Sequence, residues 1–258
     1  MIESHLTERV TAILLIEDGV ERIRAIAALR DSAPVDALDS IISLLASPEQ
    51  RLRRRAGSSL SCFRDRVAPR AGVLVEHLLH HSDPPIRLSC AIVLMNVPAP
   101  PVTEAYRCAL GDSFDKVVQI ACVELGSRGG AENADALIRV LDHPSWRVRL
   151  EACKALITLG KADQRVVATL EAMSQEPEAG TYDAQCDDFE RIQQEVAQES
   201  GESPPWGRLW GKLHSILERA RNLAAAGGTA KPDAPPLNGG PTTRVGSSGV
   251  AEGPPSVS

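Results

Sequence analysis

Three histidines and a glutamate stand close together and are the residues best suited to metal chemistry. His77 and His81 lie four residues apart, with His80 and Glu76 nearby, and this spacing puts both imidazoles on one face of a helix. Two imidazoles could bind zinc, but a zinc site needs a third or fourth ligand, and no HExxH or similar motif accompanies them. We therefore expect a structural or surface role for this group, and we predict no metal ion and no cofactor.

An arginine-rich stretch is the best candidate for binding an acidic or phosphorylated ligand, because guanidinium groups bind carboxylates and phosphates through two donors. Its members are Arg51, Arg53, Arg54, Arg55, Arg64, Arg66 and Arg70, and only Asp65 interrupts them with an opposite charge. We count Arg54, Arg55, Arg64, Arg66 and Arg70 as candidate partner-binding residues. Runs of charge usually face solvent, so the simpler expectation is a solvated helix surface around the repeat arginine Arg53.

Signals of nucleophilic catalysis are missing from the sequence. There is no glycine-rich phosphate loop, no GxSxG motif and no paired cysteine and histidine. The six cysteines include no CxxC pair. We expect Cys90, Cys122 and Cys153 to be buried thiols in the core, and we predict no catalytic residue.

Two series of leucines repeat at a nearly constant interval and must organise the elements that carry these side chains. In both series the members are separated by 31, 34, 31 and 31 residues, and the second series precedes the first by 15 residues. Such periods are typical of solenoids, in which each unit buries its apolar face against its neighbours. The first series is Leu29, Leu60, Leu94, Leu125 and Leu156, and the second is Leu14, Leu45, Leu79, Leu110 and Leu141.

Other positions recur with the leucines and define a helical stripe. Four residues before each leucine of the first series stands a small residue: Ala25, Ala56, Cys90, Ala121 and Ala152. Seven residues before it stand Arg22, Arg53, Arg87, Val118 and Arg149. Small residues let a neighbouring helix approach closely, and we expect each arginine to offer its guanidinium to a nearby carbonyl or acid.

Turn signals between the two series predict two short antiparallel helices in each unit. Serine, aspartate and glycine precede proline or serine at Ser47-Pro48, Ser82-Asp83-Pro84, Gly111-Asp112-Ser113 and Asp142-His143-Pro144. The three additional residues between Leu60 and Leu79 fall at 62–70, which we interpret as a longer turn. We predict an all-α fold, a right-handed α-solenoid of about five helical hairpins.

The segments Ile86-Arg87-Leu88-Ser89-Cys90-Ala91 and Val148–Leu156 resemble the short HEAT repeat, also called the PBS-lyase HEAT-like repeat. The resemblance covers about residues 3–175 and implies a helical-repeat fold that serves scaffolds, adaptors and a few enzymes. The di-iron hydroxylases of this kind need repeated His-Glu pairs, and the equivalent positions here read Leu88-Ser89, Gln119-Ile120 and Leu150-Glu151. The DNA glycosylases need a basic groove with tryptophans, whereas Trp146 is the only tryptophan within these repeats.

The second helices of HEAT-like pairs usually line the concave face, so the resemblance places the likeliest contact surface there. The candidates on these helices are Arg70, Glu76, His77, Glu104, Arg107, Asp135 and Arg139.

The net charge of −6 is unevenly distributed along the chain. Residues 1–175 have 21 basic and 22 acidic groups, whereas residues 176–202 have nine acids and one arginine. A nearly neutral solenoid lacks the charge of a dedicated nucleic-acid-binding protein. The first residues lack the features of a signal peptide, and no apolar run is long enough to span a bilayer, so we expect a protein of the reducing cytoplasm.

The last third of the chain has a different composition. We predict a solenoid at 1–175, an acidic amphipathic helix and linker at 176–202, a basic amphipathic helix at 203–226 and a disordered tail at 227–258. The acidic helix is expected to cap the last repeat, with docking of a basic partner as the alternative. The basic helix, with Trp206 and Trp210 on its apolar face, either folds back onto the solenoid, enters a partner's groove or, least favoured, lies on a membrane surface.

We predict a non-catalytic scaffold or adaptor that binds another protein through its concave face. Two alternatives remain open: an accessory subunit of an enzyme, of the lyase or chaperone type that the HEAT-like resemblance implies, and nucleic-acid binding through the arginine-rich second repeat. Salt-dependent binding of DNA or RNA would favour the nucleic-acid alternative.

Overall fold

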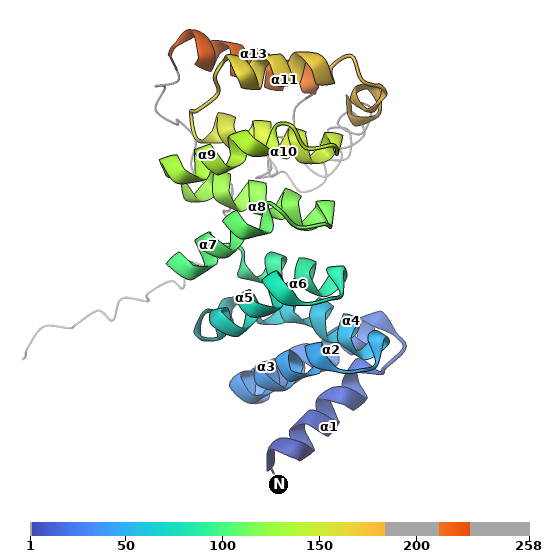
Figure 1. The fold of residues 1–258 in the computed structure, drawn as a ribbon. Coiled ribbons are helices and arrows are strands. Elements are labelled where there is room, and N and C mark those ends of the chain that lie inside the picture. The colour runs from blue at the N-terminus through green and yellow to red at the C-terminus, as the bar shows by residue number, and fades with distance from the viewer. Residues whose placement is uncertain (1, 184–211, 228–258) are drawn as a thin grey trace, which may run out of the picture.

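The protein is a single elongated stack of helices, as the computed structural model shows for residues 2–183 and 212–227. Within these two ranges every regular element is an α-helix or a 3-10 helix, and none is a strand. The helices follow one another from α1 at one end to α13 at the other (Figure 1). The predicted all-α solenoid is confirmed.

Five helical hairpins form most of the stack. The first helices of the pairs are α2 (Gly19–Ser32), α4 (Gln50–Ser59), α6 (Pro84–Leu94), α8 (Asp115–Arg128) and α10 (Trp146–Thr158). The second helices are α3 (Pro34–Ser43), α5 (Ala71–His80), α7 (Pro100–Ala109), α9 (Ala131–Val140) and α11 (Gln164–Met173). Helix α1 (Ile2–Leu14) carries the first leucine of the second series, so it corresponds to a second helix without a first one.

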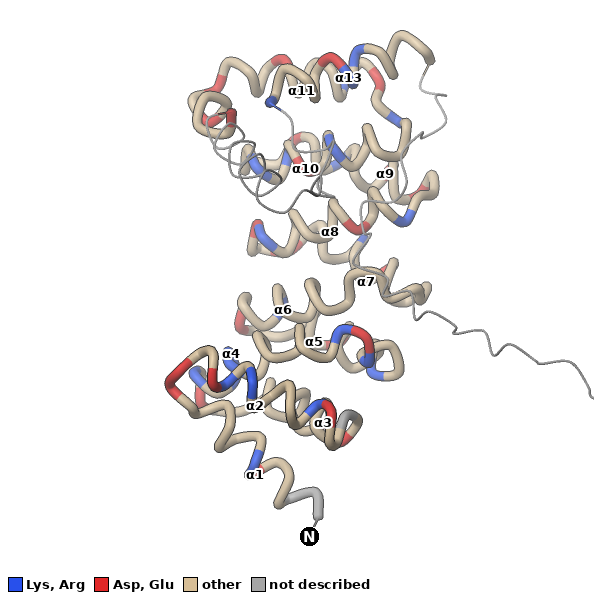
Figure 2. Tube along the Cα trace, turned by 180° about the vertical axis from the view of Figure 1, so that it is seen from behind, with Lys and Arg blue, Asp and Glu red and all other residues tan. Residues whose placement is uncertain are grey.

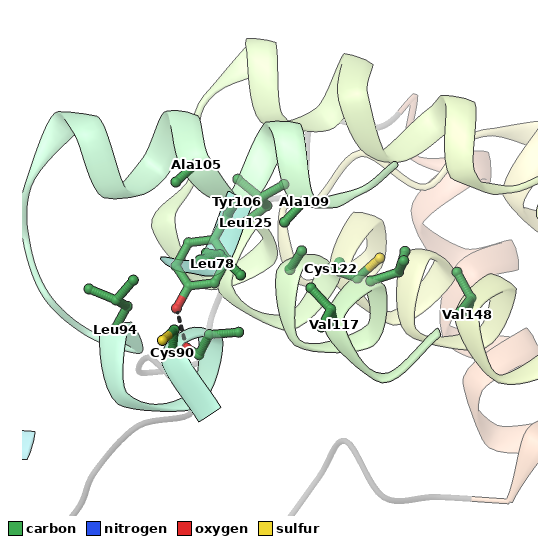
Figure 3. Close-up of a cluster of buried hydrophobic side chains, with 14 of the residues drawn as sticks. Leu78, Cys90, Leu94, Ala105, Tyr106, Ala109, Val117, Cys122, Leu125 and Val148 are labelled. Atoms are coloured by element: carbon green, nitrogen blue, oxygen red, sulfur yellow. Dashed lines mark hydrogen bonds between the residues drawn. The ribbon is translucent and has the colours of Figure 1, made fainter. Parts of the chain in front are cut away.

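Both leucine series point into the core, as the spacing predicts. All five leucines of the first series are buried. In the second series Leu79 and Leu110 are partly buried against the core and the other three are fully buried. Tyr106 fills the space between two repeats, where its hydroxyl donates a hydrogen bond of 2.6 Å to the carbonyl of Ala91 (Figure 3).

The first helices approach one another closely where their residues are small. A Cβ atom on Gly126 of α8 would lie 2.8 Å from both Cα and Cβ of Ala155 in α10. Carbon atoms that are not bonded to each other do not come this close. Helices α8 and α10 are in contact along this line. Packing of side chains in such interiors is as dense as in organic crystals, so the small residue sets the distance between the two repeats.

The repeat arginines clamp the turn that precedes each first helix. Each lies four residues after the N-cap, and its Nη1 donates to the carbonyl oxygen six residues earlier at 2.7 to 3.0 Å. It also lies within 3.4 Å of the carbonyl five residues earlier. The arginines with this geometry are Arg22, Arg53, Arg87 and Arg149. The prediction that they bind a nearby carbonyl is confirmed.

Three of these arginines also pair with an acid in the turn of the following repeat. Arg53 lies 3.8 Å from Asp83, and the other two bind their acids more closely. Arg87 forms two bonds of 2.7 Å with the carboxylate of Asp112, and Arg149 binds Glu176 at 2.6 and 2.7 Å. Hydrogen bonding to Asp112 raises the pKa of Arg87 further above its ordinary value. One side chain therefore joins its own turn to the next one.

The same turns share a second bond, made by a side chain two residues before the N-cap. This side chain accepts the backbone N–H of the N-cap residue in four successive turns, at 2.7 to 3.2 Å. The acceptors are Ser47, His81, Asp112 and His143. The sequence predicted turns at these positions, and in the structure this side chain binds the amide of the N-cap residue itself.

The three additional residues of the second repeat are part of the core. They fall among the 3-10 helices η2 (Leu60–Arg66) and η3 (Ala68–Arg70), and a third 3-10 helix, η1 (Leu44–Ala46), ends the preceding hairpin. Phe63 and Val67 have no exposed surface. The inserted stretch therefore contributes large apolar side chains to the core, which its interpretation as a longer turn did not predict.

A buried ion pair holds the connection between α6 and α7. Glu124 of α8 is fully buried, and its Oε2 lies 3.0 Å from Nη2 of Arg128. Arg128 also donates to the carbonyl of Val97 at 3.0 Å, and Glu124 accepts the N–H of Asn96. Asn96 has a φ of 65°, which is uncommon for residues other than glycine, so these bonds fix a strained turn.

The far end of the stack is closed by residues after the fifth hairpin. Residues 177–183 are helical, and the ring of Tyr182 packs 5.4 Å from that of Trp146. Helix α13 (Leu213–Ala225) packs on α11 with Leu213, Ile216, Leu217 and Ala220 buried. Trp146 is only 6% exposed, so its side chain contributes to packing.

None of the helices formed by residues 2–183 and 212–227 combines the length and apolarity needed to cross a bilayer.

Substitution of Gly126 by alanine tests the close approach of α8 and α10. We expect Gly126→Ala to lower the free energy of unfolding by about 1 to 3 kcal/mol, because its methyl group overpacks the contact with Ala155. Gly72→Ala is the matched control, because no atom lies within 4 Å of its added Cβ. The control should gain about 0.4 to 1 kcal/mol. Urea unfolding midpoints measure both changes, and an unchanged midpoint for Gly126→Ala would contradict the packing described.

A second prediction concerns alkaline pH. Burial raises the pKa of the Cys90 thiol to about 12 from the ordinary 9.0, so the folded protein keeps a proton that the unfolded chain loses. The buried thiol therefore does not lower the free energy of unfolding below pH 9. This free energy falls as the pH rises from 9 toward 12, because only the unfolded chain loses the proton. In that window Cys90→Ala should reduce the slope of unfolding free energy against pH by about 1.4 kcal/mol per unit. Equal slopes for the wild type and Cys90→Ala would contradict the burial of this thiol.

Candidate functional site

The predicted contact residues of the second helices divide into two groups. The residues from Arg70 to Arg107 are engaged mainly with their own neighbours, whereas Asp135 and Arg139 of α9 are exposed.

Arg70 joins two hairpins. Its Nη2 lies 2.7 Å from Oδ2 of Asp39 in α3, and its Nε binds the other carboxylate oxygen. This hydrogen bonding lowers the pKa of Asp39 below its ordinary value. Because both donors point at α3, Arg70 serves first as a link between neighbouring repeats.

The histidine group on α5 is occupied by internal contacts. His81 Nδ1 accepts the N–H of Asp83 at 3.0 Å, so the ring's Nε2 carries the proton and donates to the carbonyl of Leu45 at 2.9 Å. His77 is half-buried beside this ring, and burial, followed by the proximity of His81, lowers the pKa of His77. Glu76 is exposed and lies 3.8 Å from His80. Among the residues that the structure describes, no cluster of three or more histidine, cysteine, aspartate or glutamate side chains could hold a metal ion.

Arg107 links α7 to α9. Its guanidinium lies 2.9 Å from Oε2 of Glu104 and 2.9 Å from Oδ1 of Asn133, and it is 3.4 Å from Glu132. The pair Glu104 and Arg107 is therefore preorganised, with an exposed carboxylate beside a partly covered guanidinium.

Two open grooves flank α9 on the surface formed by the second helices. The α7–α9 groove has a volume of about 440 Å³ and is lined by Arg107, Cys108, Leu110, Gly111, Ala136, Arg139, Val140, Asp142 and His143. The α9–α11 groove has a volume of about 560 Å³ and is lined by Ala131, Ala134, Asp135, Ile138, Lys161, Ala162, Asp163, Gln164, Ala224 and Gly227.

The two grooves share α9 as a common wall. The lining residues of α9 alternate between its two flanks with the period of an α-helix. Asp135 and Arg139 are one turn apart on the ridge between the grooves, and both are exposed. The ridge therefore offers one anion and one cation about 6 Å apart along the helix axis.

The grooves include residues that the sequence did not single out. Cys108, His143, Lys161, Asp163 and Ile138 line them. Most of these residues stand at helix ends and in turns, outside the periodic positions. The only available signal was their closeness in sequence to α9 and α11.

The arginine-rich stretch does not form one group in space. Arg51 and Arg55 bind Glu17, and Arg55 also donates to the carbonyl of Leu14 at 2.9 Å. Arg54 lies 3.4 Å from Asp83 on the other side of α4. Figure 2 shows acidic segments interspersed with the basic ones around α2 and α4. Hydrogen bonding to Arg51, the largest influence, lowers the pKa of Glu17.

Arg64 and Arg66 also have partners within the molecule. Nη2 of Arg64 lies 3.3 Å from the carbonyl of Ile92, and Arg66 lies 3.4 Å from the neighbouring Asp65. Both arginines are exposed. The anion-binding hypothesis for this stretch therefore rests on separate arginines, each of which already contacts at least one acceptor within the molecule.

The structure describes only some of the candidate residues near the C-terminus. Trp206 and Trp210 lie outside the described residues, as does most of the acidic segment at 176–202. The helix after them contacts the solenoid, because Arg221 of α13 binds Glu171 of α11 at 2.8 Å and Asp183 accepts the N–H of Leu213.

Comparison with known proteins identifies the repeat type. Residues 103–185, which run from within α7 to beyond α11, match the family model for HEAT repeats. A search of curated proteins gave no match.

Similar solved structures include an engineered protein, which is 17% identical, with 86% of this chain and 97% of that chain covered at a TM-score of 0.45. A designed armadillo repeat protein is 14% identical, with 84% and 98% covered at a TM-score of 0.44. Human deoxyhypusine hydroxylase in complex with glycerol is 14% identical, with 88% and 98% covered at a TM-score of 0.37. TM-scores this low say nothing about the activity of this chain.

Substitution of two neighbouring arginines tests whether the arginine-rich stretch is structural. We expect Arg55→Met to cost about 1 to 2 kcal/mol of unfolding free energy, because it leaves the carbonyl of Leu14 without its donor. Arg54→Met, at a side chain that is 51% exposed, should change stability by less than about 0.5 kcal/mol. Thermal or urea unfolding measures both. Equal effects of the two substitutions would show that the internal contacts of Arg55 contribute nothing.

Proposed function

We propose that this chain, whose residues 103–185 are HEAT repeats, is a non-catalytic adaptor that binds another protein through the surface of α7, α9 and α11. The observation that carries the proposal is the pair of grooves on either side of the exposed Asp135 and Arg139 ridge. HEAT-repeat folds commonly mediate protein interaction.

Preorganisation supports this assignment. The helices that form the grooves are held by repeat stacking and by links such as the Arg107 and Asn133 contact. A partner would therefore meet a surface whose ordering cost was met during folding, which favours affinity. The mixture of apolar walls with a few charged groups is also typical of protein interfaces.

The charges of the surface favour a protein partner over nucleic acid. The grooves and ridge together carry Arg107, Arg139 and Lys161 against Asp135, Asp142 and Asp163. Binding of a phosphate backbone depends on an excess of lysine and arginine, which this surface lacks. No observation favours the accessory-enzyme alternative.

The free thiols agree with a reducing compartment. Cys62, Cys90, Cys108, Cys122 and Cys153 form no disulfide in the structure. We therefore propose that the adaptor works in the cytoplasm.

A charge exchange on the ridge tests the proposed surface. The double variant Asp135→Arg with Arg139→Asp keeps the net charge but exchanges the positions of the two charges that a partner would recognise. In affinity capture from cells with quantitative mass spectrometry, we expect the full-length double variant to retain its specific partner at least about tenfold less, as for loss of a binding hot spot.

The matched control makes the same exchange on α2, at Glu21 and Arg24, which are both exposed. Glu21→Arg with Arg24→Asp should retain the partner like the wild type. If the ridge variant and the wild type capture the same partners in equal amounts, or if neither captures any, this surface is not the interface.

A further inference from the structure

The α9–α11 groove combines small apolar walls with three charged groups. Its walls are mostly alanine, with Ile138 as the largest apolar side chain. Asp135 and Lys161 are exposed at its edges. Asp163 caps α11 through Oδ1, which accepts two backbone N–H groups. Such a groove suits a narrow chain with small side chains and one charge of each sign.

The chain itself leaves helix α13 at this groove. Ala224 and Gly227, at the end of α13, line it. The N–H of Gly227 donates to the carbonyl of Ala224, and Gly227 has a φ of 73°. This left-handed conformation ends the helix and turns the backbone, as glycine commonly does at this position. The next residues of the sequence therefore start at the rim of the groove.

The composition of the following segment complements the groove. Residues 229–235 read Thr-Ala-Lys-Pro-Asp-Ala-Pro. Their side chains are small apart from Lys231, and Lys231 and Asp233 are the two charges. The groove offers two acids and one base. Proline residues lack a backbone donor, so fewer N–H groups would lose water against the alanine walls.

We propose that residues 229–235 of this chain occupy the α9–α11 groove, with Lys231 facing Asp135 and Asp163, and Asp233 facing Lys161. The covalent connection lowers the entropic cost of this contact, because a segment attached at the rim has an effective concentration of about millimolar or more. This inference concerns the chain alone, so it can hold even if no protein partner binds the ridge.

Methyl NMR on the full-length chain tests the proposal. With isoleucine δ1-methyl groups labelled, the signal of Ile138 reports the contents of the groove. The variant Lys231→Glu with Asp233→Lys keeps the net charge but reverses both proposed contacts. We expect its Ile138 signal to shift, while the signals of the buried Ile26 and Ile41 stay unchanged. In the wild type, about 1 M salt should shift the Ile138 signal in the same direction, since the Debye length is then about 3 Å.

The control makes the same exchange farther along the sequence, with Arg244→Glu and Glu252→Lys, and should leave the Ile138 signal in place. A second arm adds Asp135→Lys and Lys161→Glu to the Lys231 and Asp233 variant. The Lys231 and Asp233 variant alone should speed up amide hydrogen exchange at residues 131–138. The combined variant should slow this hydrogen exchange again. The proposal is wrong if the tail exchange leaves Ile138 unmoved, if the distant exchange moves it equally, or if the combined variant restores no protection.

Discussion

The close approach of successive first helices is the constraint on which the rest of the structure depends. Small residues at one position of each first helix let the next helix come near, and the leucine four residues later fills the space beside it. A further close approach lies one residue beyond Leu125, where Gly126 comes so near to Ala155 that even a methyl group would not fit. Since each hairpin buries its apolar face only against its neighbours, this distance is transmitted from repeat to repeat. It fixes how far apart the second helices lie, and so how wide the grooves between them are.

The turns add a directional element to this stacking. In four of the five hairpins, a repeat arginine four residues after the N-cap binds the carbonyls of the turn behind it. Arg53, Arg87 and Arg149 also reach an acid in the next turn. A guanidinium has donors in a rigid planar fork, so it can hold two turns in one orientation where lysine could not. The fourth repeat has Val118 at this position. There Asp112 still accepts the amide of the N-cap residue Phe114 at 2.7 Å, so the turn keeps one of its two bonds.

The sequence predicted the fold well and the candidate surface only in part, for a physical reason. Stacking imposes the same demand on every repeat, so the buried positions recur and the leucine series could be recognised without a structure. Binding surfaces have no such periodicity. The arginines at 51–55 are adjacent in sequence, but a helix turns by about 100° per residue, which directs Arg54 and Arg55 to different neighbours. In the same way, Lys161 and Gly227 are far apart in the chain and meet in one groove only because α13 returns to α11.

The two halves of the second-helix surface use their charges differently, and this difference has a functional consequence. Near the N-terminus, Arg70 and Asp39 neutralise each other across two hairpins. Around α9, the charges of the ridge stand beside open grooves instead. A surface charge that has no internal partner loses less when a ligand binds it, because no existing bond must be broken. The proposed binding surface therefore lies at the C-terminal repeats, where the chain also continues beyond α13. Binding of a partner and placement of that continuation would then depend on the same few side chains of α9 and of the turn before α11.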